Sequence, residues 1–462
     1  MKKNLLLLFI YSLAANAQFG EQVVISTTTE RPQFVKPFDI DNDGFMDILS
    51  ASGEDFKLTW YKNVDGLGSF GPKIILNTIS NAYLNIQFVD IDGDEDKDLL
   101  YLVNNPKRIA WLENLDGAGN FSPEQVIIEN QPNFIININA NDIDIDGDLD
   151  LVVTYTDTFN GWVVWYENVD GQGNFSEETL LIQNNTELLG PYLIDIDNDG
   201  LLDILTSHES YYPSKIVWHK NLGGVQFGEA QEIYQFDYRF SDWTSLYDLK
   251  LVDINSDNKI DIVVTANHED FGTLIKWLEN LDNDGSYGLP QTILVENRGY
   301  NFFDLDNDND LDFLLWNNYN NILSWMENED GQGNFSEERI ITSEIDFPTY
   351  ATATDLNDDG YLDVISASIA DDKLAWYPNN ILGIENNFQT KTLVFPNPTT
   401  GLIKFYTSLS ISQVEVYNLL GQKITEALNT NELNISTLEI GMYLVKIKNA
   451  KGIEQVFRIL KE

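Results

Sequence analysis

The sequence predicts an all-β protein, a seven-bladed β-propeller followed by a small C-terminal β-sandwich. Three observations lead to this fold class. An aspartate-rich motif recurs seven times, a Trp–Asn motif recurs in step with it, and the composition changes sharply near residue 380. Aromatic residues make up 12% of the chain, which suits a β-rich protein.

The aspartate-rich motif has the form Asp-x-Asp-x-Asp-Gly-x-x-Asp and runs into a β-prone apolar segment. A period of roughly 50 residues built from short strands is typical of a propeller blade. A stacked solenoid is the alternative, but it needs capping repeats and shorter units. The motif begins at Asp39, Asp90, Asp142, Asp195, Asp253, Asp304 and Asp355, at intervals of 51, 52, 53, 58, 51 and 51 residues.

The second motif is a Trp with an Asn three positions later. Each repeat unit is expected to hold four strands: one enters the aspartate loop, one leaves it, one carries the Trp, and one follows a Gly-rich turn such as 171–175. Four strands per unit again indicate a propeller. The Trp residues are Trp60, Trp111, Trp165, Trp218, Trp277, Trp325 and Trp376.

The two ends of the repeat array complement each other. The seventh unit ends near Pro378 without a fourth strand, while Phe19–Ile25 matches the fourth-strand segment Phe121–Ile127. We therefore expect residues 21–26 to complete the last blade. This closure joins the two ends of the ring and removes an exposed strand edge.

Alternating carboxylates are the ligands that a hard cation prefers, and a glycine at position six of the nine-residue motif permits a sharp turn. We predict up to seven structural Ca²⁺ ions, with the fifth loop the weakest because it has lost one charge and the glycine. The ligands expected at positions one, three, five and nine are Asp39, Asp41, Asp43 and Asp47; Asp90, Asp92, Asp94 and Asp98; Asp142, Asp144, Asp146 and Asp150; Asp195, Asp197, Asp199 and Asp203; Asp253, Asn255, Asp257 and Asp261; Asp304, Asp306, Asp308 and Asp312; and Asp355, Asn357, Asp359 and Asp363.

Sites for other cations fit the loops less well. An EF-hand would place Glu at position twelve between helices, and the flanks here are β-prone. Mg²⁺ prefers fewer carboxylates, and catalytic transition metals need His or Cys ligands. Seven solvated acidic turns remain the alternative to a metal, although close carboxylates repel one another unless a cation or a proton compensates.

The loops resemble the FG-GAP and VCBS repeats of integrin-α-like propellers, over about residues 19–378. The resemblance implies that calcium is structural and stiffens each blade; it does not fix a ligand. Two departures are the altered fifth loop and a degenerate Phe-Gly signature, which is closest at Phe70-Gly71-Pro72.

The last part of the chain has a different composition. From Ile384 onward there is no Asp, and three alternating runs, at 394–398, 414–422 and 438–447, indicate strands. This segment resembles the C-terminal sorting domain of proteins exported by the type IX secretion system of Bacteroidetes. The resemblance implies handling by that machinery and an outer-membrane surface or extracellular location. A carbohydrate-binding or fibronectin-like module is the alternative.

The N-terminus has the pattern of a signal peptide, with Lys2 and Lys3, an apolar run, and small residues up to Ala17. The expected domains are therefore a signal peptide at 1–17, a propeller at 18–378, a linker at 379–391 and a sorting domain at 392–462. No span of the mature chain is apolar enough to cross a membrane.

Possible ligand-binding residues lie on the face opposite the aspartate loops, formed by the turns between second and third strands and by the links between blades. His208 and His268 occupy corresponding turns, and the longest link brings Arg239 and Trp243. Together with Tyr211 and Tyr212 they could stack on a sugar and pair with a carboxylate. The aromatics expected on this face are Phe56, Tyr155, Phe159, Tyr211, Tyr212, Phe271, Trp316 and Tyr319.

Three functions stay open from the sequence. The first is a non-catalytic module that binds a glycan or a surface protein. The second is a polysaccharide lyase with His208, His268 or Tyr211 as base and Arg239 neutralising a uronate. The third is a purely structural surface protein. A net charge of -47 argues against nucleic acid as a partner, and the absence of cysteine excludes disulfides.

Overall fold

The computed structural model describes residues 18–78, 83–157, 159–209, 214–236, 246–268, 272–295, 298–380, 393–395, 399–406, 411–418, 422–438, 440–449 and 454–461. The predicted signal peptide and most of the predicted linker lie outside these residues. The chain divides into two compact units, residues 1–383 and 384–462. Each unit is described by itself.

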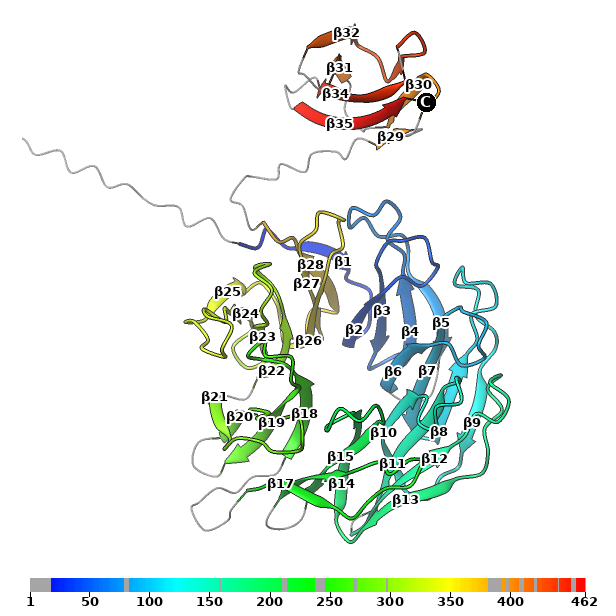
Figure 1. The fold of residues 1–462 in the computed structure, drawn as a ribbon, viewed down its shortest axis with the longest axis vertical. Coiled ribbons are helices and arrows are strands. Elements are labelled where there is room, and N and C mark those ends of the chain that lie inside the picture. The colour runs from blue at the N-terminus through cyan, green and yellow to red at the C-terminus, as the bar shows by residue number, and fades with distance from the viewer. Residues whose placement is uncertain are drawn as a thin grey trace, which may run out of the picture. The chain divides into compact units, whose positions relative to one another are not determined.

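The first unit is a seven-bladed propeller, as predicted. It contains seven four-stranded antiparallel sheets, and six of them follow the chain order of their strands. Figure 1 shows the sheets arranged around a common centre, with strands such as β2, β6 and β10 toward the inside and β5, β9 and β13 toward the rim.

Each of the six continuous blades contains four consecutive strands. They are β2 (Pro32–Phe38), β3 (Asp47–Ser52), β4 (Lys57–Tyr61) and β5 (Ile74–Thr78); β6 (Tyr83–Val89), β7 (Asp98–Asn104), β8 (Lys107–Leu112) and β9 (Gln125–Glu129); β10 (Phe134–Asn141), β11 (Asp150–Thr156), β12 (Gly161–Tyr166) and β13 (Thr179–Asn184); β14 (Glu187–Ile194), β15 (Asp203–Glu209), β16 (Lys215–His219) and β17 (Gln231–Gln235); β18 (Leu246–Val252), β19 (Asp261–His268), β20 (Gly272–Leu278) and β21 (Gln291–Val295); and β22 (Gly299–Phe303), β23 (Asp312–Asn317), β24 (Ile322–Met326) and β25 (Arg339–Thr342).

The seventh blade is built from both ends of the propeller, as the sequence predicted. Strands β26 (Pro348–Thr354), β27 (Asp363–Ser368) and β28 (Lys373–Tyr377) are completed by β1 (Val23–Ser26). Val23 pairs with Trp376 and Val24 with Ala375 in antiparallel register. The ring is closed because the fourth strand of this blade comes from the first residues of the domain.

Apolar side chains from neighbouring blades form the core. Each of the seven junctions holds its own hydrophobic cluster. The second strands are covered on both faces by neighbouring blades; β11, for example, is buried throughout. The closing junction joins Val35 and Tyr61 of blade one to Trp376 of blade seven.

The motif Trp packs beneath the Gly-rich turn of the next blade. A Cβ on Gly119 would stand 2.7 Å from the ring of Trp60, and one on Gly173 would stand 2.8 Å from Trp111. Both glycines also have a positive φ, of 79° in each case. Only glycine meets both demands, so the Trp and the Gly-rich turn of successive repeats act as one packing unit.

The second unit is a small β-sandwich, as predicted. One sheet contains β29 (Leu393–Phe395), β30 (Leu402–Tyr406) and β33 (Glu432–Asn434), and the other has the order β32 (Lys423–Leu428), β31 (Ile411–Tyr417), β34 (Gly441–Asn449) and β35 (Glu454–Lys461). The two sheets share a core that includes Phe405, Val414 and Val445.

Candidate metal centres and the opposite face

The aspartate loops join the first and second strands of each blade. In loop one, the position-one carboxylate of Asp39 accepts the backbone N–H groups of Asp43 (3.1 Å) and Gly44 (2.8 Å). Six of the seven loops repeat this pair of bonds, and the carboxylate of Asp90 in loop two accepts from Gly93 and Glu95 instead. These bonds curl the loop so that its acidic side chains converge.

Glycine is not essential at position six. It adopts a positive φ in four loops, but Glu95, Asn258 and Asn309 reach φ values of 76°, 64° and 74° at the same position. Loops without the glycine therefore keep the same sharp turn. The backbone N–H of each of these three residues donates to the position-one carboxylate, and this hydrogen bond offsets the strain of the left-handed conformation.

The position-nine aspartate is buried in every loop, and in all loops except loop three both of its carboxylate oxygens accept a backbone N–H. In loop one, Asp47 accepts the N–H of Ile40 on Oδ2 (3.2 Å) and the N–H of Asn63 on Oδ1 (2.7 Å). Burial outweighs these two bonds and raises the pKa of Asp47 to about 7 and that of Asp363 to about 8. Each carboxylate oxygen retains a second lone pair, so the position-nine carboxylates could still coordinate a cation.

The motif Asn links consecutive loops, a role that the sequence did not reveal. Its side-chain amide donates to the position-two carbonyl oxygen of the preceding blade, as from Asn168 to Ile91 (2.9 Å) and from Asn379 to Leu305 (2.6 Å). Five of the seven motif Asn residues make this bond. The constant Trp–Asn spacing was the only sequence signal of this role, and the spacing alone does not identify the carbonyl oxygen to which the Asn donates.

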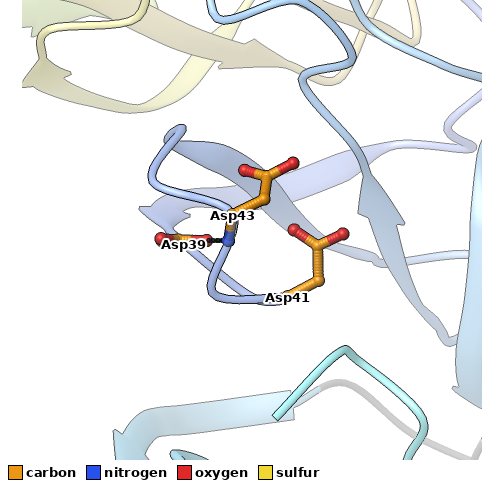
Figure 2. A group of neighbouring side chains, drawn as sticks. All are labelled: Asp39, Asp41 and Asp43. Atoms are coloured by element: carbon orange, nitrogen blue, oxygen red, sulfur yellow. Dashed lines mark hydrogen bonds between the residues drawn. The ribbon is translucent and has the colours of Figure 1, made fainter. Parts of the chain in front are cut away.

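Three carboxylates converge in five loops. Figure 2 shows this group in loop one, where Asp41 and Asp43 extend beside Asp39, which accepts the backbone N–H of Asp43. In each group, one oxygen of every residue lies within 4.8 Å of the others. The groups are Asp39, Asp41 and Asp43; Asp90, Asp92 and Asp98; Asp142, Asp144 and Asp146; Asp195, Asp197 and Asp199; and Asp304, Asp306 and Asp308.

In four loops the position-three aspartate has a buried oxygen that accepts no hydrogen bond from the described part of the chain. The Oδ1 atoms of Asp41, Asp92, Asp197 and Asp306 are buried without a hydrogen-bond donor among the described residues. A buried carboxylate oxygen without a donor is costly, and a cation would remove that cost. The donor set is all oxygen, which fits calcium.

Loops five and seven have Asn at position three. One polar atom of the Asn255 amide lies 3.1 Å from an Oδ1 atom of both Asp253 and Asp257. If that atom is oxygen, the three oxygens form a cage that a cation would hold. If it is nitrogen, Asn255 donates to both carboxylates and closes the loop itself.

Repulsion is strongest in loops two, three and six, which carry an extra aspartate at position seven. Burial and neighbouring carboxylates raise the pKa of Asp148 to about 6 in loop three and that of Asp306 and Asp310 to about 6 in loop six. The same causes raise the pKa of Asp96 in loop two. These shifts show that the loops hold more negative charge than their own donors neutralise.

Most of the predicted ligand cluster lies outside the described residues. Tyr211, Tyr212, Arg239, Trp243 and Phe271 are outside them, and His268 ends β19 with its side chain outside them. His208 lies on β15, where the Asn184 amide contacts its ring Nδ1 at 2.6 Å. Burial lowers the pKa of His208 to about 4, so its ring is neutral at pH 7.

Two aromatics expected on this face are packing residues instead. Tyr155 is 3% exposed and bonds to the hydroxyl of Tyr166 at 2.7 Å, while Trp316 is 8% exposed and donates to Thr349 O. Both belong to second strands, which are covered by neighbouring blades. The prediction that these two residues lie on the surface was wrong. They stand within the last residues of β11 and β23, which are buried, and not in the exposed turns that follow these strands.

Four aromatic side chains are exposed among the described residues, and all lie on the face opposite the loops. Phe159 and Tyr319 were predicted there, whereas Phe134 and Phe347, at the start of first strands, were missed. Their exposed fractions are 55% for Phe134, 71% for Phe159, 73% for Tyr319 and 37% for Phe347. The exposed apolar residues around the loops, such as Leu115 and Leu222, are aliphatic.

Phe159 and Tyr319 are held on turns of the same construction. Asp157 Oδ1 accepts the N–H groups of Phe159 and Asn160, both at 2.7 Å. Asn317 Oδ1 accepts those of Tyr319 (2.9 Å) and Asn320 (3.0 Å) in the same way. The rings are therefore presented to solvent on fixed backbones.

No helix among the described residues has the length and apolar character that crossing a membrane requires.

Two family profiles match this chain. The profile of the FG-GAP-like repeat matches residues 39–101, 142–206 and 304–366, and that of the secretion system C-terminal sorting domain matches residues 393–462. The first covers all loops except loop five, which spans 253–261. Among curated proteins nothing matches the chain.

Three solved structures are similar to this chain at low sequence identity. A lectin from Agrocybe aegerita, described for specific recognition of non-reducing terminal N-acetylglucosamine, is 17% identical with a TM-score of 0.50, over 74% of this chain and 86% of its own. BBS1N in complex with ARL6DN is 9% identical with a TM-score of 0.50, over 79% and 97%. The Dos1 propeller is 10% identical with a TM-score of 0.42, over 72% and 74%.

Proposed function

Because the chain is a secreted or surface β-propeller with FG-GAP-like repeats and a secretion sorting domain, we propose that calcium braces its loops and that its opposite face binds a carbohydrate. The two roles belong to different faces. The loops stiffen the blades, and the opposite turns meet the ligand.

The buried position-three oxygens carry the calcium proposal. Asp92 and Asp306, in loops two and six, each have a buried Oδ1 with no hydrogen-bond donor among the described residues. The residues at positions one, three and five would hold the ion, with position nine behind them. Bound calcium would supply the positive charge that offsets their mutual repulsion.

A thermal unfolding series tests the calcium role. The purified chain is heated in EDTA, in millimolar Mg²⁺ and in millimolar Ca²⁺. Binding to the folded state alone adds about 2.7 kcal/mol per site at one hundred times Kd, so Ca²⁺ should raise Tm well above the EDTA value and Mg²⁺ much less. Equal Tm values in EDTA and Ca²⁺ would refute the proposal.

The exposed aromatics carry the carbohydrate proposal. Aromatic rings stack on the apolar faces of sugars and keep a polar rim for hydroxyl groups. Phe159 and Tyr319 are the most exposed of the four and are fixed by their turns. The lectin structure shares only the fold, but it is compatible with sugar binding on a propeller.

Glycan arrays with the purified chain at millimolar calcium test this role. Phe159→Ala with Tyr319→Ala should weaken any glycan signal at least about tenfold, which corresponds to 1.4 kcal/mol. Leu222→Ala, 63% exposed on the loop face, is the matched control and should leave binding unchanged. Pull-down of a surface protein with no glycan signal would instead make a protein the ligand.

A further inference from the structure

We propose that Lys62 and Lys220 are built-in cations of loops one and four, so that these loops neutralise themselves while loops two, three and six depend on calcium. The inference deepens the calcium role proposed above and rests on it. It divides seven similar motifs into loops of different affinity.

The two lysines occupy the same place in the repeat, immediately before the motif Asn. Lys62 pairs with Asp41, and its Nζ lies 2.9 Å from Asp43 Oδ2. Lys220 pairs with Asp197, and its Nζ lies 3.0 Å from Asp199 Oδ2. Each ammonium thus bridges positions three and five, whose carboxylates would also bind calcium.

The equivalent residue in loops two, three and six is a glutamate: Glu113, Glu167 and Glu327. The same loops have Asp96, Asp148 and Asp310 at position seven, where loops one and four have Phe45 and Leu201. At these positions and the four ligand positions, loops two, three and six each carry six carboxylates, against four carboxylates and one ammonium in loops one and four. In loop six, Arg339 pairs with Glu327, so the extra charge there is that of Asp310.

Buried oxygens without a donor add a second distinction. The position-seven Oδ1 atoms of Asp148 and Asp310 are buried and have no hydrogen-bond donor among the described residues. At a few ångströms, each unpaired like charge adds repulsion that only a cation or a proton removes. Loops three and six lack a lysine at the bridging position to serve as that cation.

Calcium affinity follows from this difference. To enter loop one or four, Ca²⁺ must displace an ammonium that already neutralises two of its ligands. In loops two, three and six it meets extra negative charge instead, and ligand charge is one of the factors that sets calcium affinity. Loops five and seven, with Asn255 and Asn357 at position three, belong to neither class.

Calcium titration of the full chain by calorimetry tests the division. Lys62→Gln with Lys220→Gln should add two tight sites per chain, each about tenfold tighter than the corresponding loop of the unaltered protein. The control is Lys215→Gln. Lys215 on β16 pairs with Glu232 on β17 at 2.6 Å, outside the aspartate loops. This variant should bind as the unaltered chain does.

The reverse substitution keeps the test valid if the lysine variants fold poorly. Glu113→Lys should remove one tight site and raise Tm in EDTA, because loop two would then carry its own cation. Unchanged site numbers in both the lysine and the glutamate variants, with calcium still binding, would overturn the inference alone. Absence of calcium binding by every variant would overturn the calcium role itself.

Discussion

Asn168 donates its side-chain amide to the carbonyl oxygen of Ile91 at 2.9 Å, and this hydrogen bond joins blade three to the aspartate loop of blade two. The backbone N–H of Asn168 bonds to Asp150 in its own loop (2.9 Å), while the N–H of Ile91 bonds to Asp98 in the other (2.9 Å). Hydrogen bonds therefore run from one buried aspartate to the next across the junction. Ordering of one loop should favour ordering of its neighbour.

Removing this amide should weaken the propeller more than removing its counterpart in blade four. Asn221 bonds to Leu202 O and accepts from Gly223 N within its own blade. Asn168→Ala leaves Ile91 O without its donor, and a buried group left unpaired costs about 1–3 kcal/mol. We expect Tm to fall further in Asn168→Ala than in Asn221→Ala by calorimetry. Equal losses would show that the inter-blade bond is worth little.

The position-nine and position-seven aspartates should respond oppositely to truncation. Asp312→Ala leaves the N–H groups of Leu305 and Asn328 unpaired, and we expect a loss of about 2–5 kcal/mol in free energy of unfolding by urea titration. Asp310→Ala, two residues earlier, removes a repelled carboxylate. It should leave stability in EDTA unchanged or raised. A destabilised Asp310→Ala in EDTA would contradict this account of the repulsion.

Stability without calcium should rise as pH falls. Burial raises the folded-state pKa of Asp363 to about 8 and those of Asp98 and Asp312 to about 7, all above the ordinary aspartate value of 3.8. The folded state therefore binds more protons than the unfolded state between about pH 4 and pH 8, and stability is lost as pH rises through that window.

Calorimetry from pH 5 to pH 8.5 in EDTA should show Tm falling with pH. The trend should persist in high salt, which screens surface repulsion but not buried groups. In millimolar Ca²⁺ it should flatten or reverse, because calcium binds deprotonated carboxylates. A Tm that rises with pH in EDTA would mean that these carboxylates are charged without penalty.

The closing strand should be essential to the ring. Deleting residues 18–27 exposes the edge of β28, which β1 covers. Unpaired edges invite pairing with other chains, so we expect a lower Tm and a shift toward dimers or larger species by light scattering. A synthetic peptide of residues 18–30 should restore the monomer. A monomer of unchanged stability would show that the seam contributes little.

The repeat period and the chain ends were sufficient to predict the fold. The motif beginning at Asp39 and the match between Phe19–Ile25 and Phe121–Ile127 indicated the blade number and the closure, because both depend on local pattern. Contacts between blades depend on three-dimensional neighbours, so the sequence did not predict them. For example, several side chains of first strands donate to a backbone carbonyl on the first strand of the next blade at 2.6–2.9 Å; they are those of Lys36, Gln87, Asn139 and Asn301.

The candidate metal loops and the altered fifth loop were predicted by motif, but the lysines and glutamates that distinguish the other loops were not. Lys62 and Glu113 stand well beyond the first aspartate of their loops, outside the nine-residue motif. Their approach to the loop follows from strand pairing between β3 and β4 or β7 and β8. The hydrogen bond from the backbone N–H of Asn63 to Asp47 likewise could not be predicted from the sequence, because it depends on how the strands pair.

The seam between β1 and β28 also sets an order of events in time. Strand β1, which precedes all other strands of the propeller in sequence, pairs with β28, which follows them, and Gln18 O accepts the N–H of Asn380 at 2.6 Å. A chain that emerges or is threaded from its N-terminus cannot seal the ring until residue 377 has followed. Until then the seventh blade lacks one of its four strands and the ring stays open.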